Sequence, residues 1–583
     1  MDKIIKMIPL ALAAASVGVP WSASEALESK IGPRLQGVLD AFESGRKNPV
    51  PTIVSEIKIP VIVHFSGRPD LEKIAGEEPD EDVRHERVVR ELRLVSEWNQ
   101  ESIRSLLADL GMSEIDELWL LNGMAVKLPP WVIDHLTLYP EVSQITLDYT
   151  IEVAAGQPAN QGPPEWNLSV IGAPDVWASG FTGQGVVVAN MDTGVDLTDP
   201  AIATAWRGGN NSWFDPNCPT TSGTPGNCGQ PRDSMGHGTE TMSVMVGGND
   251  DLGNAIGVAP DAQWIAVKIF DDTGMATISA IHAGFQWLLD PDGDPTTNDA
   301  PDIVNNSWVI PTKVDACILD YQPDIQALKA AGIAVVFAAG NNGVFNHSNT
   351  SVSPSNNPES FAVGAIDNLD RLAGFSSQGP GPAGTPCGDG FFPEVVAPGM
   401  NIRMVTNSAL PVPQYTNASG TSFAAPHVAG AMALLLSVDP NLAVTQLESI
   451  LAQSARDQIN PGDPAGPDNT YGYGALDVAA AYQWLVTDTD GDGVMDAYDN
   501  CVTIANPDQF DSDGDGFGNW CDADLNNDGF VNVTDLSIFR QAYLTHNRDA
   551  DFNGSGGLVN LTDLLIFKTR YLHKPGPSGW ALP

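Results

Sequence analysis

Between residues 166 and 485 the chain repeats one pattern, a short apolar run that ends in small or polar residues and is followed by a helical segment. The clearest runs are GVVVANMDTG, AQWIAVKIF, DIVNNSW and IAVVFAAGNNG. Such runs are typical of buried strands, and their alternation with helices predicts a parallel sheet covered by helices on both faces. The carboxyl ends of parallel strands meet at one edge of the sheet, so we expect a site there.

Four side chains of complementary chemistry stand at or near the ends of these segments. Asp192 ends a strand, His237 lies between two glycines ahead of a helix, Asn341 closes another strand, and Ser422 begins an alanine-rich helix. Taken singly, they are a turn residue, a packed histidine, a second turn residue and a helix N-cap. Taken together, they supply the nucleophile, the base, the group that orients the base and the oxyanion donor that acyl transfer requires.

These residues lie in segments that resemble a known family. MDTGVD, GHGTETM, AAGNNG and GTSFAAPHVAG are similar to the four signature blocks of subtilisin-like serine peptidases, in the family's order, and further segments such as PEVVAPGMNI resemble its bacillopeptidase F-like branch. The resemblance implies that Ser422 attacks the scissile carbonyl, His237 acts as base and then acid, and Asp192 holds the histidine tautomer. The Asn341 amide and the Ser422 N–H form the implied oxyanion hole.

The same resemblance implies that the substrate pairs with backbone, which favours extended peptide segments of proteins. The matching positions are a peptide-pairing strand and one wall of the primary specificity pocket, namely Ser307, Trp308 and Val309, and Ala338, Ala339 and Gly340. The family usually has Gly where Val309 stands, so we expect a restricted approach of the substrate.

Three further residues near these blocks carry their own expectations. Many relatives have His where Glu240 stands, one helical turn after His237; Glu240 raises the pKa of His237 if it is close, although an exposed carboxylate is the ordinary outcome. His427 is expected to be a structural helix residue. Pro426 is expected to be tolerated as part of the first helical turn, where its missing N–H has no intrahelical acceptor.

The N-terminus, residues 1–24, has lysines, a short apolar run and then small residues, which is the order of a secretory signal peptide. We expect cleavage after Ser24 or Ala26 and release of the protein outside the cell. We expect no later stretch to be long and apolar enough to form a membrane helix.

Residues 27–150 read as a small αβ unit with a long charged helix. The segment that contains NGMAVKLP is similar to the end of the inhibitor-type propeptide of this family, which implies a ferredoxin-like prodomain that assists folding, blocks the cleft and is then removed. The alternative is a permanent substrate-binding domain. The Gly- and Pro-rich linker 151–165 favours removal, with the mature chain starting between about 151 and 166.

The charge and the cysteine content of the chain limit which partners it can bind and which redox compartment it suits. Asp and Glu number 73 against 28 Lys and Arg, a formal charge of −45, which argues against nucleic acid as a partner and suits calcium sites. Six cysteines fit an oxidising compartment. Cys218 with Cys228, and Cys501 with Cys521, are plausible pairs by position, whereas pairing Cys317 with Cys387 rests on elimination alone.

The C-terminal part changes to Asp/Gly/Asn-rich sequence. Residues 488–522 resemble thrombospondin type 3 repeats, whose alternating carboxylates are candidate Ca²⁺ ligands: Asp488, Asp490, Asp492 and Asp496, and Asp511, Asp513 and Asp515. Residues 523–574 contain a tandem loop-plus-helix repeat that looks like a dockerin-type pair of calcium loops, ahead of a tail at 575–583. The expected ligands are Asp524, Asn526, Asp528, Phe530 (carbonyl), Asn532 and Asp535 in the first loop, and Asp551, Asn553, Ser555, Asn560 and Asp563 in the second.

A dockerin resemblance implies a cohesin-like partner, but a metal-stiffened appendage is the favoured interpretation. The sequence as a whole predicts a secreted, calcium-binding serine endopeptidase made as a preproprotein, with its own prodomain as inhibitor. The alternative is a catalytically silent protein of the same fold that attaches to a partner through its calcium modules. An α/β-hydrolase esterase is set aside because its nucleophile precedes the acid and the histidine, whereas here the serine comes last.

Overall fold

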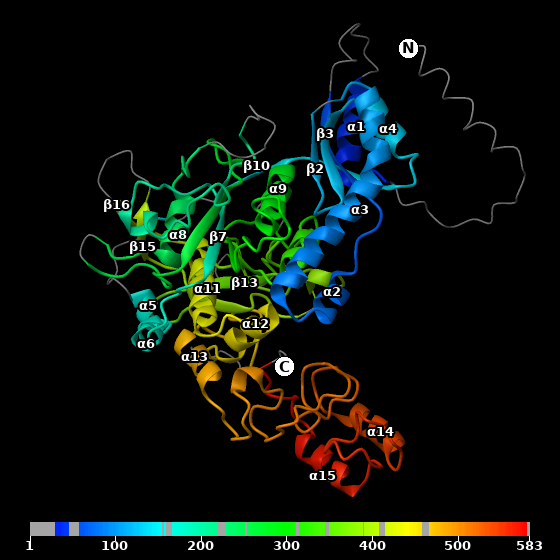
Figure 1. The fold of residues 1–583 in the computed structure, drawn as a ribbon, viewed down its shortest axis with the longest axis vertical. Helices are drawn as coiled ribbons and strands as arrows, with labels where there is room; N and C mark the ends of the chain where they lie inside the picture. The colour runs from blue at the N-terminus through cyan, green and yellow to red at the C-terminus, as the bar shows by residue number, and fades with distance from the viewer. Residues whose placement is uncertain are drawn as a thin grey trace, which may run out of the picture.

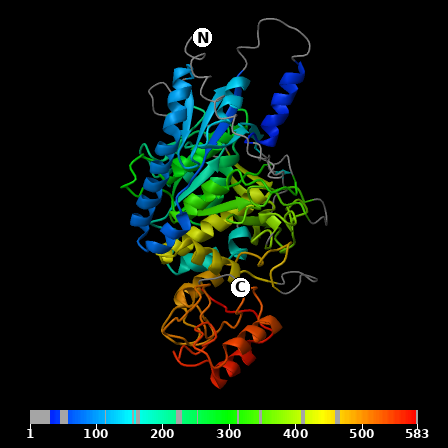
Figure 2. The same cartoon turned by 90° about the vertical axis from the view of Figure 1, so that its right-hand side faces the viewer.

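The computed structural model describes residues 30–45, 58–112, 114–153, 157–158, 166–218, 229–250, 253–310, 314–343, 349–388, 390–406, 414–457 and 466–579. The predicted signal peptide, most of the linker 151–165, Cys228 and the last four residues of the tail lie outside the described residues. Three bodies follow one another along the longest axis of the molecule, with the N-terminal domain at one end and the C-terminal modules at the other (Figures 1 and 2).

The N-terminal domain is an antiparallel four-stranded sheet in the order β2-β3-β1-β4, flanked by helices. Its elements are α1 (Pro33–Gly45), β1 (Ile59–Phe65), α2 (Leu71–Glu77), α3 (Glu81–Asp109), β2 (Ile115–Leu118), β3 (Gly123–Leu128), α4 (Pro130–Leu136) and β4 (Val142–Leu147). This βαββαβ order gives the ferredoxin-like domain that the sequence predicts.

The central domain is built on a seven-stranded parallel sheet, ordered β14-β13-β12-β11-β7-β9-β8. The strands are β7 (Val187–Asp192), β8 (Trp213–Phe214), β9 (Gln263–Lys268), β11 (Ile303–Asn306), β12 (Ala334–Ala338), β13 (Phe361–Ile366) and β14 (Val395–Pro398). All four runs singled out in the sequence are strands of this sheet, which confirms the predicted α/β architecture.

Helices cover both faces of the sheet. One face packs against α5 (Trp166–Val170), α6 (Ala173–Ala178), α7 (Pro200–Ala203), α8 (His237–Val246), α11 (Thr421–Val438), α12 (Val444–Gln453) and α13 (Val478–Val486). The other packs against α9 (Ile278–Leu289) and α10 (Gln322–Ala330). Alternate residues of β7 therefore enter different cores, with Val188 on the α11 face and Ala189 on the α9 face.

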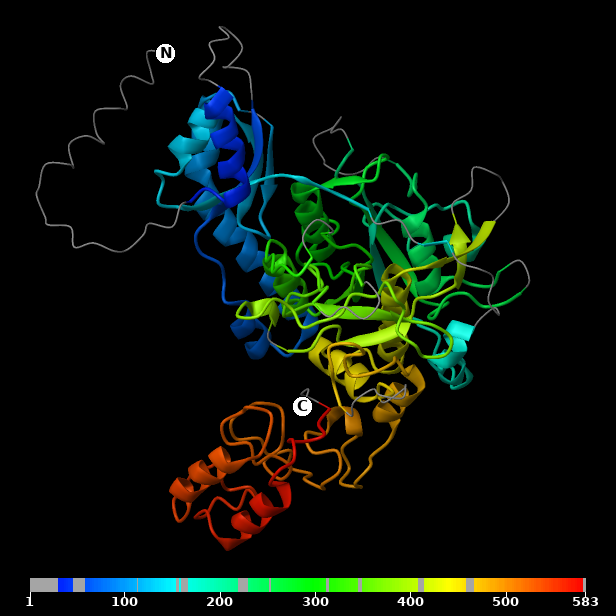
Figure 3. The same cartoon turned by 180° about the vertical axis from the view of Figure 1, so that it is seen from behind.

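The N-terminal domain packs onto the α9 and α10 face through an apolar cluster that the two domains share. Val88 and Leu92 of α3 lie in one core with Ile325 and Leu328 of α10. The chain then leaves this domain and crosses to the central one (Figure 3). There β5 (Thr150–Glu152) pairs with β10 (Met275–Thr277), and β6 (Gln157–Pro158) adds to the hairpin of β15 (Ile402–Thr406) and β16 (Gln414–Ser419).

The C-terminal modules contain little regular structure: η3 (Asp496–Tyr498), α14 (Val533–Ala542) and α15 (Leu561–Arg570). A small core of Phe539, Phe552 and Phe567 joins the two loop-plus-helix units, as the tandem repeat predicts. Cys501 and Cys521 form a disulfide there, and Cys317 pairs with Cys387 near η2 (Pro386–Gly388) in the central domain. Cys218 is also disulfide-bonded.

One described helix, α11, is long and apolar enough to cross a membrane, and 83% of it is buried inside the protein. By length and composition alone this helix differs from the expectation that no later stretch is long and apolar enough. Its residues, from Ala424 to Leu435, belong to the main core, so α11 is a core helix of this fold.

Candidate active site

Asp192 and His237 meet at the edge of the sheet where the strands end. Asp192 is the last residue of β7, and His237 is the first of α8. The Nδ1 atom of His237 lies 2.9 and 3.0 Å from the two carboxylate oxygens of Asp192, with both side chains buried. Because the carboxylate accepts, Nδ1 carries the proton and Nε2 is left as the basic nitrogen.

The start of α8 is held tightly against the turn that follows β7. The Gly238 N–H donates to the Thr193 hydroxyl at 2.8 Å, and the Thr193 N–H donates to Asp192 at 2.7 Å. A Cβ at Gly238 would lie 2.1 Å from the carbonyl oxygen of Gly194, so only glycine fits. This explains the glycine that follows the histidine in the sequence.

Ser422 is the second residue of α11. Gly420 is the N-cap of this helix, and Thr421 is its first residue. Its Oγ donates to the carbonyl of Ser307 at 3.2 Å, and the ring of its neighbour Phe423 lies 5.9 Å from the ring of His237. Within the described residues, His237 Nε2 is buried without a hydrogen-bond partner. A catalytic hydrogen bond of this kind is often unmade until a substrate is bound.

The explanation given for Pro426 from sequence is wrong. The helix begins at Thr421, so Pro426 is its sixth residue and lies beyond the first turn. Its missing N–H leaves the carbonyl of Ser422 without its helical donor. The hydroxyl of Ser307 donates to that carbonyl at 2.7 Å, which satisfies it.

Asn341 follows β12 and faces the start of α11. Its Oδ1 accepts hydrogen bonds from both the N–H and the hydroxyl of Thr421, each at 2.9 Å. These two donors define which amide atom is oxygen, and they leave Nδ2 as the donor beside Gly420, where a Cβ would lie 3.6 Å from it. An amide N–H and a helix N-terminus therefore converge next to Ser422.

The charge around His237 raises its basicity. Burial lowers the pKa of His237, but the Asp192 carboxylate, its hydrogen bond, and the charges of Glu240 and Asp233 outweigh burial and raise the pKa to about 9. Glu240 is partly buried and accepts from Thr406 at 3.1 Å, and burial raises its own pKa. The expectation of an exposed carboxylate is therefore wrong, and Glu240 acts on the histidine.

The residues expected to contact substrate lie around Ser422. Ser307 exchanges hydrogen bonds with Ser422. Trp308 turns its ring away into the α9 core, against Phe337, so it offers only backbone. Val309 is also buried. The wall residues, which end or follow β12, are Ala338, Ala339 and Gly340. The Gly340 N–H donates to Thr421 at 3.1 Å, which ties this wall to the serine helix.

His427 is a structural residue, as predicted. Its ring bonds to the Phe423 carbonyl at 2.7 Å and to Asn167 at 2.8 Å, and burial lowers its pKa to about 4.

Two of the predicted carboxylate groups of the C-terminal modules come together. The ligand oxygens of Asp488, Asp490 and Asp492, and separately those of Asp511, Asp513 and Asp515, lie within 4.8 Å of one another. Asp496 instead accepts from Thr489 through both of its oxygens. Like charges at this spacing repel, so a cation fits each cluster.

The two loop-plus-helix units hold a carboxylate of the kind that calcium loops use. Asp535 and Asp563 are fully buried, and in each the Oδ1 atom has no hydrogen-bond partner among the described residues. Asp524 and Asp551 begin the loops and accept from the loop backbone at Gly529 and Gly556. An orphaned buried carboxylate oxygen at the end of an acidic loop fits Ca²⁺.

A third carboxylate cluster that was not predicted from the sequence, Asp290, Asp292 and Asp299, lies after α9. Arg93 of α3 forms an ion pair with Asp290 and donates to the Gly293 carbonyl at 3.0 Å, so the N-terminal domain neutralises part of this cluster. A candidate further calcium site in the central domain, at DDLGNAIGVAP, had no clear ligands in the sequence; its first residue, Asp250, pairs with Arg403 at 2.7 Å.

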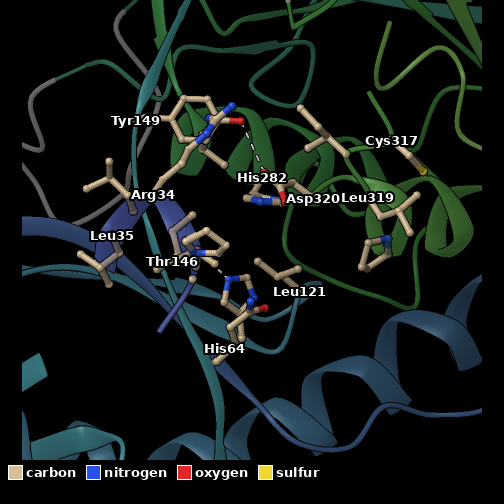
Figure 4. A pocket seen from close by; sticks show the side chains of 18 residues that line it. Arg34, Leu35, His64, Leu121, Thr146, Tyr149, His282, Cys317, Leu319 and Asp320 are labelled. Atoms are coloured by element: carbon tan, nitrogen blue, oxygen red, sulfur yellow. Dashed lines mark hydrogen bonds between the residues drawn. The ribbon is translucent and has the colours of Figure 1, made fainter. Parts of the chain in front are cut away.

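A cavity of about 480 Å³ lies at the junction of the N-terminal and central domains (Figure 4). His64 and Thr146, which bond to each other at 2.8 Å, face His282 across it. Burial and the charge of His282 lower the pKa of His64 to about 4. The four candidate catalytic residues do not line this cavity, so it is separate from their site.

Comparisons with known proteins decide the family. The profile of the subtilase family matches residues 183–474, and thrombospondin type 3 repeats match 487–509 and 510–536. Subtilisin E of Bacillus subtilis (strain 168) is 30% identical over 380 residues, which cover 65% of this chain and 86% of that protein. The chain belongs to the subtilase family. It is a serine endopeptidase of that family, with calcium-type repeats at its C-terminus.

Other relatives align with this subtilase over different fractions of the two chains. Bacillopeptidase F of Bacillus subtilis (strain 168) is 34% identical over 437 residues, which are 70% of this subtilase but only 29% of that relative. The alkaline protease of Alkalihalobacillus alcalophilus is 29% identical over 442 residues, which are 75% of this subtilase and 99% of the relative. The second thrombospondin match includes the loop from 524 to 535, which was predicted to belong to a separate dockerin-like module.

Proposed function

We propose that this chain is an exported subtilase, made as a preproenzyme, that hydrolyses peptide bonds in extended segments of proteins. The observation that carries the proposal is the buried His237–Asp192 pair, set beside a serine at a helix N-terminus. The family match and the signal-like N-terminus support it.

In the proposed reaction Ser422 Oγ forms a bond to the scissile carbonyl carbon while its proton passes to His237 Nε2. Asp192 holds the other ring nitrogen, keeps the tautomer and stabilises the imidazolium. The negative charge that develops on the carbonyl oxygen is met by Asn341 Nδ2 and the Ser422 N–H. His237 then gives its proton to the leaving amine, and water resolves the acyl-enzyme by the same route in reverse.

The chain's own linker supports self-processing. The Val153 N–H donates to the Gly274 carbonyl at 3.0 Å, which extends the pairing of β5 with β10. Gln157 pairs with Ser419, three residues before Ser422. The linker is thus paired with β10 before this gap and with the strand that leads to Ser422 after it, and we place the cut between Val153 and Gln157. This position falls within the start range predicted from sequence, with residues 27–150 as the inhibitory prodomain.

Calcium is the proposed ligand of the C-terminal modules. The carboxylate clusters and the orphaned oxygens of Asp535 and Asp563 would hold it, and the ion would order loops whose charges otherwise repel. We regard the paired loops as a metal-stiffened appendage, since the comparisons give a cohesin-like partner no support.

Mass spectrometry of the full-length chain tests the proposal, with wild type beside Ser422→Ala. Ser437→Ala is the matched control, because Ser437 lies on the same helix. We expect wild type and Ser437→Ala to gain a new N-terminus between Val153 and Gln157, and Ser422→Ala to keep its N-terminal domain. If all three chains keep that domain or all lose it, and peptide cleavage is also absent, the silent binding protein is the better explanation.

A further inference from the structure

A chain of buried polar side chains runs beneath the candidate site, from the start of α8 to the start of α11. Asn190 lies on β7, two residues before Asp192, and Asn305 is its direct partner on the neighbouring strand β11. Both positions face α8 and α11, where the adjoining Val188 and Ile303 are apolar core residues. An amide there is costly unless its hydrogen bonds are made.

These hydrogen bonds are nearly all made, and donation runs outward from Asn305, toward α8 through Asn190 and toward α11 through Ser307. Asn190 Nδ2 donates to the Gly238 carbonyl and to the Thr241 hydroxyl of α8, each at 2.9 Å. Asn190 Oδ1 accepts from Asn305 Nδ2, also at 2.9 Å. Asn190 therefore joins the turn that carries the histidine to the neighbouring strand.

The chain continues from Asn305 to the serine. Asn305 Nδ2 also donates to Ser307 Oγ at 2.9 Å, so the Ser307 hydroxyl must point its own hydrogen elsewhere. It donates to the Ser422 carbonyl at 2.7 Å, the group that Pro426 leaves without a helical donor. Asn190, Asn305 and Ser307 are each at most 1% exposed, so water does not compete for these bonds.

We propose that Asn190 is a positioning residue, which acts through Asn305 and Ser307 to fix the first turn of the serine helix relative to the histidine. The inference rests on the proposed function of Ser422 and His237. Asn190 touches neither the substrate nor the reacting atoms. Its contribution is to hold Gly238 and the Ser422 carbonyl in one bonded frame, so that Oγ, Nε2 and the oxyanion donors keep their mutual geometry.

Asn306 offers a matched control. It is the next residue on β11 after Asn305, is equally buried, and donates to the Val336 carbonyl at 3.3 Å. It stands one position out of phase with Asn305 and therefore faces the opposite side of the sheet. Asn306→Leu perturbs the same sheet with the same change of side chain but leaves the polar chain intact.

The experiment measures kcat and KM on a chromogenic peptide, and the unfolding temperature, of each matured enzyme. The enzymes compared are wild type, Asn190→Leu, Asn306→Leu, Ser307→Ala and the double variant Asn190→Leu/Ser307→Ala. Chains that mature slowly are processed by immobilised wild-type enzyme, which is then removed. We expect Asn190→Leu to lower kcat about 10- to 100-fold at unchanged KM, as loss of alignment does. Asn306→Leu lowers the unfolding temperature similarly but keeps kcat.

Asn190 and Ser307 belong to the same series of hydrogen bonds. The double variant should therefore lose no more kcat than the worse of the two single variants. Equal losses in Asn190→Leu and Asn306→Leu, or losses that multiply in the double variant, would overturn the inference. If Asn190→Leu fails to fold, an unchanged kcat in Ser307→Ala overturns it. A Ser422→Ala chain that still cleaves the peptide refutes the proposed function instead, so the two failures are distinguishable.

Discussion

Thr421 donates two hydrogen bonds to the side-chain oxygen of Asn341. The amide nitrogen of Asn341 is therefore available to donate to the carbonyl oxygen of the substrate. Replacing Asn341 by alanine removes one donor to the developing oxyanion. We predict that Asn341→Ala lowers kcat by about 10²–10³ with little change in KM, the loss that the corresponding donor accounts for in subtilisin. Steady-state kinetics of matured enzyme measure this. Asn342→Ala is the control, and an equal loss there would contradict the assignment.

His237 must be unprotonated to accept the serine proton, so activity rises as pH increases through its pKa. That pKa is raised to about 9, partly by the negative charge of Glu240. We predict that Glu240→Gln moves the rising limb of the kcat/KM profile to lower pH, because removing a negative charge disfavours the imidazolium. Asp175→Asn, which removes an exposed carboxylate from α6, should leave the profile in place. Coincident profiles for Glu240→Gln and wild type would show that Glu240 has no influence.

At this scale the sequence predicted the four candidate catalytic residues, because each stands in a segment whose pattern is local. It did not predict Asn190, Thr421 or the role of Pro426. Their importance depends on contacts between segments that are distant along the chain, such as the bond between Asn305 and Asn190. A single asparagine within an apolar strand was the only available signal.

Among the elements, α3 links the N-terminal domain to the central one by charge as well as by apolar packing. Arg93 pairs with the fully buried carboxylate of Asp290, bonds to Gly293 and stacks on Trp119 at 4.8 Å. Its own side chain is 31% exposed, so solvent weakens the pair. Removing the arginine nevertheless leaves Asp290 buried without its cation.

We predict that Arg93→Ala speeds release of the processed prodomain about 10-fold or more, since truncating one partner of a buried pair acts mainly on dissociation. The measurement is the lag before full activity, in full-length chains that have processed themselves. Arg90→Ala is the control, because Arg90 lies on the same helix, is 57% exposed and, in the described part of the chain, forms an ion pair only with Glu86 of its own helix. A lag that shortens equally in both variants would assign the effect to helix α3 and not to this ion pair.

The sequence predicted most elements because strand and helix periods are properties of short segments. The seven-stranded sheet and the ferredoxin-like domain both have the expected elements. What periodicity does not give is the pairing of remote segments. The pairing of β6 with β16, which brings the linker beside Ser419, has no signature in either segment.

On the scale of the whole molecule, the C-terminal modules are attached to the central domain by direct packing. Ala497 of η3 is part of the main core, Tyr498 bonds to Asp439, and Gln453 bonds to the Ser578 carbonyl. These contacts involve α12 and Asp439, the C-cap of α11, at the opposite end of that helix from Ser422. The order of the modules therefore bears on the stability of the domain that they touch.

Calcium removal should act on this junction first. The modules combine two carboxylate clusters with a small core, and the protein as a whole carries a net charge of −45, so without cations the carboxylates repel one another. We predict two unfolding transitions for Ser422→Ala, chosen because it does not digest itself, in a chelator. Saturating calcium should raise the temperature of the lower transition. A calcium concentration of 100 times the dissociation constant of a site adds about 2.7 kcal/mol to the free energy of unfolding.

Asp535→Asn should reproduce part of the chelator effect in the presence of calcium, because it replaces a buried candidate ligand whose Oδ1 has no hydrogen-bond partner among the described residues. Asp508→Asn is a suitable control, since Asp508 is exposed and outside the predicted ligands. Scanning calorimetry with and without calcium measures both variants. A lower transition that ignores calcium, or that shifts equally in both variants, would mean that the modules fold by their disulfide and phenylalanine core alone.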